Sequence, residues 1–111
     1  GLTEARKVAN WCETHYIKIV PHNPLGPVSA AACAHLDIAT DNFAVQEGGL
    51  VGRPVMEDLF PVQLPYEAGC LLPPEGPGLG IEFNEEAAEH TEFKWLGGPT
   101  LRREDGSFTN W

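Results

Sequence analysis

Two short apolar segments, residues 17–20 and 43–46, flank one alanine-rich segment, residues 28–39, and this order constrains the fold more than any other feature. The first apolar segment is rich in β-branched residues, which favour strands, and alanine favours helices. Strand, helix, strand is the order of a parallel βα unit, in which the carboxyl ends of the strands open on one edge. His22 follows the first strand and Glu47 the second, so we expect both side chains to face one cavity.

A further helix is predicted before the first strand. Apolar side chains recur at i, i+3, i+4 and i+7 from Ala5 to Cys12, which predicts a helix over residues 3–13 with Thr3 as its cap. A complete eight-stranded βα barrel takes roughly 250 residues, and this chain has 111. The sequence therefore predicts an α/β chain that forms part of a larger barrel and depends on a missing remainder, because two strands cannot cover their own edges.

The character of the sequence changes after residue 50, where prolines become frequent. We expect residues 1–50 to belong to the barrel and residues 51–111 to form an extension that packs over it, with a short capped helix over residues 84–90. The last part of the chain has little periodicity but carries large apolar side chains, which need a surface to bury against. They are Phe93, Trp95, Leu101, Phe108 and Trp111.

Charge and cysteine content exclude several classes of function. Sixteen acidic residues against seven basic ones give a formal net charge of −9, which argues against nucleic-acid partners and anionic membranes because both need basic patches. No apolar run approaches the roughly 20 residues that span a bilayer. Cys12, Cys33 and Cys70 are odd in number and lack the spacing of a zinc site, so we expect reduced thiols and a cytoplasmic location.

Several segments, taken together and in order, resemble one family. They are residues 21–27 (PHNPLGP), residues 42–43 (NF) followed by 46–47 (QE), residues 76–81 (GPGLGI) and residues 103–107 (REDGS). Together these segments resemble the C-terminal part of sugar-acid dehydratases of the mandelate racemase branch of the enolase superfamily, most of all those of the galactonate dehydratase type. The resemblance covers essentially the whole chain.

The resemblance implies a fold and a set of partners. Residues 3–13 would be the sixth helix, and residues 17–20 and 43–46 the last two strands, of a (β/α)7β TIM-like barrel. The remaining residues would return to an α+β capping domain formed mainly by the N-terminal remainder of the same enzyme. Such enzymes are expected to form homo-oligomers. They use Mg²⁺ held by acidic residues on the third, fourth and fifth strands, so no metal ligand is expected in this chain.

The resemblance also implies a reaction and two site residues. A base removes the proton next to the carboxylate of a sugar acid, the magnesium ion stabilises the enediolate, and water leaves to give a 2-keto-3-deoxy sugar acid. His22 matches the acid/base histidine of the seventh strand, and Glu47 matches the glutamate that contacts the substrate carboxylate or the enediolate. Both residues are therefore predicted to be catalytic and to bind substrate. Imidazole suits its task because its ordinary pKa lies near neutrality.

Alternatives stay open at this point. A mannonate dehydratase or an acid-sugar racemase or epimerase of the same superfamily shares the scaffold and part of the site. The chain could also be a non-catalytic barrel fragment that serves as a structural or interaction module. Retention of His22 together with Glu47 favours an enzyme, since packing alone gives no reason to keep both. Asn23 stands where many close relatives have cysteine, which leaves the identity of the sugar acid open.

Overall fold

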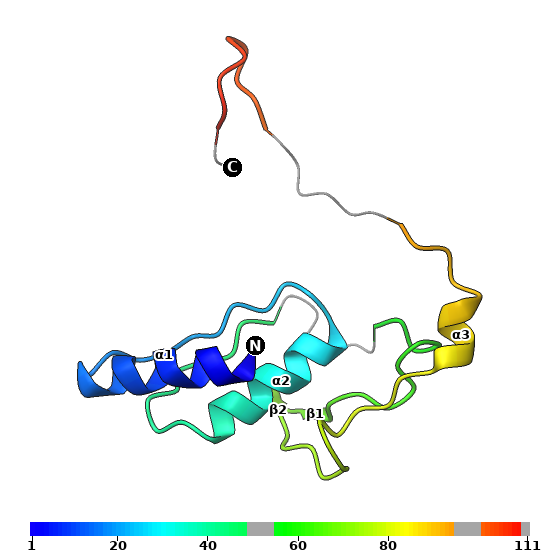
Figure 1. Ribbon diagram of the computed structural model, residues 1–111, viewed down its shortest axis with the longest axis horizontal. Coiled ribbons are helices and arrows are strands. Elements are labelled where there is room, and N and C mark those ends of the chain that lie inside the picture. The colour runs from blue at the N-terminus through cyan, green and yellow to red at the C-terminus, as the bar shows by residue number, and fades with distance from the viewer. Residues whose placement is uncertain (49–54, 95–100, 110–111) are drawn as a thin grey trace.

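The computed structural model describes residues 1–48, 55–94 and 101–109. Its two longer helices are α1 (Leu2–Thr14) and α2 (Pro27–Ile38), which pack against each other. They are followed by an antiparallel hairpin of two short strands, β1 (Tyr66–Glu67) and β2 (Cys70–Leu71), and by the short helix α3 (Glu85–Glu89). Figure 1 shows α1 and α2 together on one side, the hairpin beside α2, and α3 on the opposite side.

The helices follow the sequence pattern closely, although their ends differ slightly from prediction. Proline at the first helical position fixes the backbone angle that a helix needs, and accordingly α2 begins at Pro27. The prediction of Thr3 as the cap of the first helix was wrong. The cap position is Gly1, no side chain bonds there, and Thr3 lies inside the first turn. At α3, the side chain of Asn84 caps the helix by accepting a hydrogen bond from the Ala87 N–H at 3.1 Å.

The two predicted barrel strands lie next to each other and run parallel, but they form a single bridge rather than four-residue strands. The bridge joins Ile19 to Phe43. The Ile19 N–H donates to the Asn42 carbonyl at 2.9 Å, and the Ala44 N–H donates to the Ile19 carbonyl at 3.1 Å. The ladder is short because Pro21 has no N–H with which to continue it. The parallel orientation was predictable from the βα order, whereas the length of the ladder was not.

Buried Asn42 holds the first helix against this pair of segments. Its side-chain nitrogen donates to the Ala9 carbonyl of α1 and to the Ile17 carbonyl, each at 3.0 Å. The guanidinium of Arg6 donates to the Ala39 carbonyl just after α2. These hydrogen bonds join α1, α2 and the parallel bridge into one unit. The loop after Val20 begins at the end of this unit.

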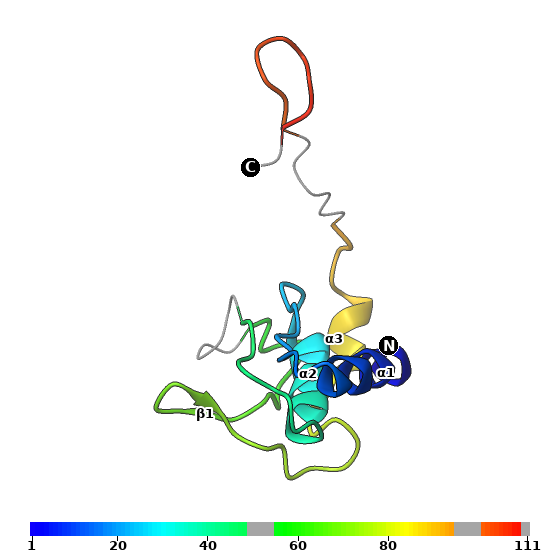
Figure 2. The ribbon, with the colours of Figure 1, turned by 90° about the vertical axis from the view of Figure 1, so that its left-hand side faces the viewer.

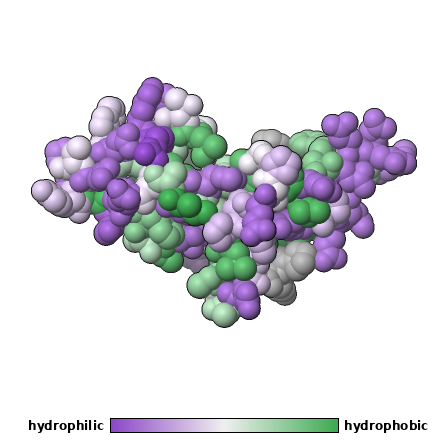
Figure 3. Space-filling view, turned by 90° about the horizontal axis from the view of Figure 1, so that it is seen from below, coloured by the Kyte–Doolittle hydropathy of each residue, from purple (hydrophilic) through white to green (hydrophobic). Residues whose placement is uncertain are grey.

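The core is small for a chain of this length. Among the described residues, the buried apolar side chains are Ala9, Ala31, Ala34, Leu36 and Phe60. Many larger apolar side chains are exposed instead, and Figure 3 shows apolar surface open to solvent on the face seen from below. The radius of gyration is 17.0 Å, against about 13 Å for a compact domain of 100 residues. Both observations fit the expectation that this chain packs against a larger protein.

The C-terminal part lies away from the helices. Figures 1 and 2 both show residues 101–109 apart from α1 and α2. Phe93 is 84% exposed and Phe108 is 69% exposed, so neither has found in this chain the surface that the sequence predicts for it. Trp95, Trp111 and the predicted boundary between residues 50 and 51 lie outside the described residues. No helix in the described part is both long and apolar enough to cross a membrane.

Candidate functional site

The structure brings His22 and Glu47 into direct contact. The Nδ1 atom of His22 lies 2.5 Å from the Oε2 atom of Glu47. The two residues are 25 positions apart in sequence, and each follows one of the two segments that form the parallel bridge. Their contact is therefore a product of the βα order, because parallel segments end on the same edge.

The loop that carries His22 is held to Glu47 by its backbone as well. The Asn23 N–H donates a hydrogen bond of 3.0 Å to the same Oε2 atom of Glu47. Asn23 itself is buried at 7% exposure, which fixes the loop at this point. The sequence analysis did not predict this hydrogen bond. A backbone N–H leaves no signal in side-chain identity, so the sequence offered no way to find it.

The chemistry of the pair follows from which imidazole nitrogen is engaged. A proton on Nδ1 is donated to Glu47, and this contact leaves Nε2 of His22 available to accept or release a proton. The side chain of His22 is 77% exposed and that of Glu47 is 48% exposed. The pair can therefore reach a small molecule, and the described residues leave it open to water.

The described residues do not fit a magnesium ion by themselves. Within residues 1–48, 55–94 and 101–109, no group of three or more His, Cys, Asp or Glu side chains could hold a metal ion. Mg²⁺ requires near-octahedral oxygen ligands, usually including one or two carboxylates. Glu47 is a single carboxylate already engaged by His22 and Asn23. These residues alone therefore do not make a magnesium site.

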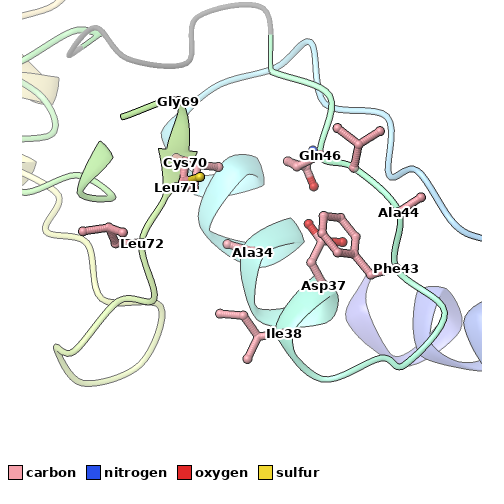
Figure 4. Close-up of a pocket in the computed structure, with 11 residues that line it drawn as sticks. Ala34, Asp37, Ile38, Phe43, Ala44, Gln46, Gly69, Cys70, Leu71 and Leu72 are labelled. Atoms are coloured by element: carbon pink, nitrogen blue, oxygen red, sulfur yellow. The ribbon is translucent and has the colours of Figure 1, made fainter. Parts of the chain in front are cut away.

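An apolar groove of about 370 Å³ lies between α2, residues 43–46 and the strand β2. Figure 4 shows Asp37, Phe43 and Gln46 facing this space from two sides. One oxygen of Asp37 and the side-chain oxygen of Gln46 are buried there, without a hydrogen-bond partner in the described part of the chain. Sequence reasoning missed Asp37, although an acid within an alanine-rich helix is a signal that could have been followed.

Burial is the cause of an unusual acidity at Asp37. The residue is 8% exposed, and burial raises the pKa of its carboxyl from 3.8 to about 6. On the preceding turn, burial also raises the pKa of the Cys33 thiol, and the nearby charge of Asp37 adds to this effect. The cysteines 12, 33 and 70 are all free thiols, as the sequence analysis expected.

Comparison with known proteins places the chain in a family. Residues 1–87 match the family described as enolase C-terminal domain-like. The chain belongs to this family. Its helices α1 and α2, the parallel bridge, and both His22 and Glu47 lie within the matched residues.

Individual relatives agree with this enolase-type assignment. A D-galactonate dehydratase family member of Streptomyces bingchenggensis is 37% identical over 114 residues, which are 100% of this chain and 27% of that protein. A D-mannonate dehydratase of a Caulobacter strain is 34% identical over 113 residues, 100% of this chain and 28% of that protein. The crystal structure of an enolase from Pantoea ananatis, with bound D-gluconate and Mg, superposes with a TM-score of 0.73 at 31% identity, covering 88% of this chain and 23% of that one.

The chain covers only part of each of these relatives. The chain spans about a quarter of the length of the relatives that it matches. The match to the enolase family agrees with the predicted α/β barrel class of the fold. The finer division into the last two strands and a tail that returns to a capping domain stays a prediction.

Proposed function

We propose that this chain is the C-terminal part of a magnesium-dependent sugar-acid dehydratase that acts on galactonate. The observation that carries the proposal is the contact of 2.5 Å between His22 and Glu47, made by residues that follow two parallel segments. The similarity to a D-galactonate dehydratase family member supports the choice of substrate class. The product would be a 2-keto-3-deoxy sugar acid.

In this proposal His22 is the acid/base catalyst and Glu47 has two tasks. Nε2 of His22 exchanges a proton with the substrate, because Nδ1 is held by Glu47. Glu47 fixes the orientation of the imidazole and lies where it can contact the substrate carboxylate or the enediolate formed from it. A positioned acid/base side chain typically contributes about 10² to 10⁴ fold to a rate, so these two residues account for a substantial share of the catalysis.

The proposed enzyme needs the remainder of the barrel. The core of this chain is small, and the remainder would enlarge it. The remainder would also cover the exposed side chains of Phe93 and Phe108 and the apolar groove beside Asp37. We place the magnesium ligands in the remainder too, since the described residues alone do not fit the ion. Within this chain, the steps that can be derived are the proton transfer at His22 and the orientation of its ring by Glu47.

The test uses a joined protein in which this chain replaces the segment of the Streptomyces relative that it matches. With Mg²⁺ and D-galactonate in D₂O, we expect proton NMR to show loss of galactonate and formation of one 2-keto-3-deoxy acid. Deuterium incorporation at C2 with inversion and no loss of water would instead indicate a racemase or epimerase. Failure to act on any sugar acid, with the joined protein folded, would contradict the enzymatic proposal and leave the structural module.

Glu47→Gln in the joined protein tests whether activity needs the proposed site and not only the fold. The amide keeps the size of the side chain but loses the charge that holds His22 and faces the substrate. We expect kcat to fall by about 10² fold or more, a typical size for removing one preorganised electrostatic contact. Glu67→Gln is the matched control because Glu67 is exposed in β1, far along the chain from the pair. Equal rates in these two variants would argue against a role for Glu47.

A mannonate dehydratase is the second candidate, favoured by the 34% identity to the Caulobacter enzyme. Both substrates lose the proton on the carbon next to the carboxylate, but they differ in configuration at that carbon, so the choice depends on which face of it is presented to His22. Assays of the joined protein with D-mannonate beside D-galactonate distinguish the two candidates. The substrate with the higher kcat/KM identifies the activity.

Asp37 gives the joined protein a predictable dependence of stability on pH. An acid whose pKa is higher in the folded chain binds its proton more tightly there. Its contribution to stability is therefore greatest below about pH 3.8 and is lost as pH rises through about 6. We expect Asp37→Asn to remove this loss, so that the variant gains stability relative to the wild type at about pH 8 compared with about pH 5. Urea unfolding midpoints at both pH values measure the effect.

Asp41→Asn is the control for Asp37→Asn, because Asp41 is exposed just after α2. An unchanged difference between the two pH values in Asp37→Asn would contradict the prediction. That result would mean that the remainder of the protein supplies a cation or a hydrogen-bond donor to the Asp37 carboxylate, which lowers its pKa again.

A further inference from the structure

The backbone ladder between the two parallel segments stops just short of the site. The Ala44 N–H donates to the Ile19 carbonyl, and the next bond of a parallel ladder would come from the N–H of residue 21. That residue is Pro21, which has no N–H. His22 and Glu47 thus lie beyond the last backbone hydrogen bond that joins their segments, and something else must keep them together.

The side chain of Gln46 makes the missing connection. Its amide nitrogen donates to the Pro21 carbonyl at 3.1 Å and to the Glu47 carbonyl at 2.6 Å. The amide has two N–H groups, so both bonds can form at once. One acceptor belongs to the residue before His22 and the other to Glu47 itself, and Figure 4 shows the Gln46 side chain extending from its segment.

We propose that Gln46 is a positioning residue that replaces the ladder bond lost at Pro21 and thereby sets His22 opposite Glu47. This inference rests on the proposed function of the pair and adds a third residue to it. In the described part of the chain the Gln46 side chain donates its hydrogen bonds to backbone carbonyl oxygens, so its effect on the reaction passes through the geometry of the other two residues. Small displacements of reacting groups are costly, and a misplacement of about 1 Å can reduce a rate by about 10² fold.

The test replaces Gln46 by Met in the joined protein. Methionine has nearly the same length and no charge, but it cannot donate a hydrogen bond. We expect kcat to fall by about 10 to 10² fold with KM changed by less than about threefold, because binding groups outside the pair remain in place.

Gln63→Met is the matched control. The amide of Gln63 also donates to two backbone carbonyls, those of Val55 and Phe60, each at 2.9 Å. Its oxygen also accepts a hydrogen bond from the Val55 N–H at 3.1 Å, so Gln63→Met loses both donated bonds and one more. Gln63 lies outside the proposed site, so this variant measures the effect of such losses on stability. We expect its kcat to stay within about twofold of the wild type. A fall in kcat that is no larger in Gln46→Met than in Gln63→Met would overturn the inference.

A double-mutant cycle with Glu47→Gln tests whether Gln46 acts through the pair. If it does, the double variant should have nearly the kcat of Glu47→Gln alone, because the geometry being protected is already lost. Strictly multiplicative losses would mean that Gln46 has only an independent, structural effect, and the inference would be wrong.

Crystal structures of the joined protein decide the question even if no sugar acid is turned over. We expect His22 Nδ1 and Glu47 Oε2 to be within hydrogen-bond distance in the wild type and to separate in Gln46→Met. An intact pair in Gln46→Met would refute the positioning role. Absence of turnover in a wild type whose pair is intact would count against the proposed function alone, so the two failures are distinguishable.

Discussion

His22→Asn should reduce kcat of the joined protein by about 10² to 10⁴ fold while leaving its fold and its magnesium binding unchanged. Asparagine keeps much of the shape and a hydrogen-bonding group near Glu47, but it cannot accept and release a proton near neutral pH. His22 is bonded to Glu47 through Nδ1 and is otherwise largely exposed, so the loss of the ring removes chemistry and little packing. Steady-state kinetics with D-galactonate, together with thermal unfolding of each variant, measure the two effects separately.

His15→Asn is the matched control, because His15 is exposed at the end of α1 and its side chain makes no hydrogen bond in the described part of the chain. It should leave kcat within about twofold of the wild type, as distant surface substitutions generally do. Dehydration of galactonate at close to the wild-type rate by His22→Asn would show that another group carries the proton. The dehydratase proposal would then lose its strongest internal support.

The parts of the fold that local pattern controls could be predicted. The alanine-rich segment forms α2 within one residue of the predicted ends, since Pro27 and the run of small side chains decide the conformation without distant contacts. The order strand, helix, strand also predicted the parallel neighbours Ile19 and Phe43. From that order followed the expectation that His22 and Glu47 face one cavity, and the two side chains lie in contact at 2.5 Å.

The features that could not be predicted from the sequence depend on backbone atoms and on neighbouring strands of a barrel outside this chain. The hydrogen bond from the Asn23 N–H to Glu47 and the two carbonyls bound by Gln46 involve backbone groups that do not depend on side-chain identity, so their use leaves no compositional signal. The predicted strands shrink to one bridge because further ladder bonds need a donor that Pro21 lacks and partner strands that other parts of a barrel provide.

The proposed site also depends on parts of the protein outside this chain. A catalytic pair gains most from electrostatics when water is excluded around it, yet the side chains of His22 and Glu47 are 77% and 48% exposed. The groove between α2, residues 43–46 and β2 is apolar, and one oxygen of Asp37 and the side-chain oxygen of Gln46 are buried without a hydrogen-bond partner among the described residues. A remainder that encloses the exposed pair would also bury apolar surface of this chain, so completion of the fold and completion of the site are expected to occur together.

The isolated 111-residue chain should therefore show neither turnover of sugar acids nor tight magnesium binding, and the joined protein should show both. The described residues hold no group of three metal-ligating side chains, and the side chains of His22 and Glu47 are exposed. Calorimetric titration with Mg²⁺ should give no stoichiometric binding at about micromolar concentrations to the isolated chain, whereas the joined protein should bind about one ion per chain. Supplying the N-terminal portion as a separate polypeptide is the matched experiment, and any activity it restores should require both pieces. Micromolar, stoichiometric binding of magnesium by the isolated chain would contradict this view, because it would need a metal site that these residues do not form.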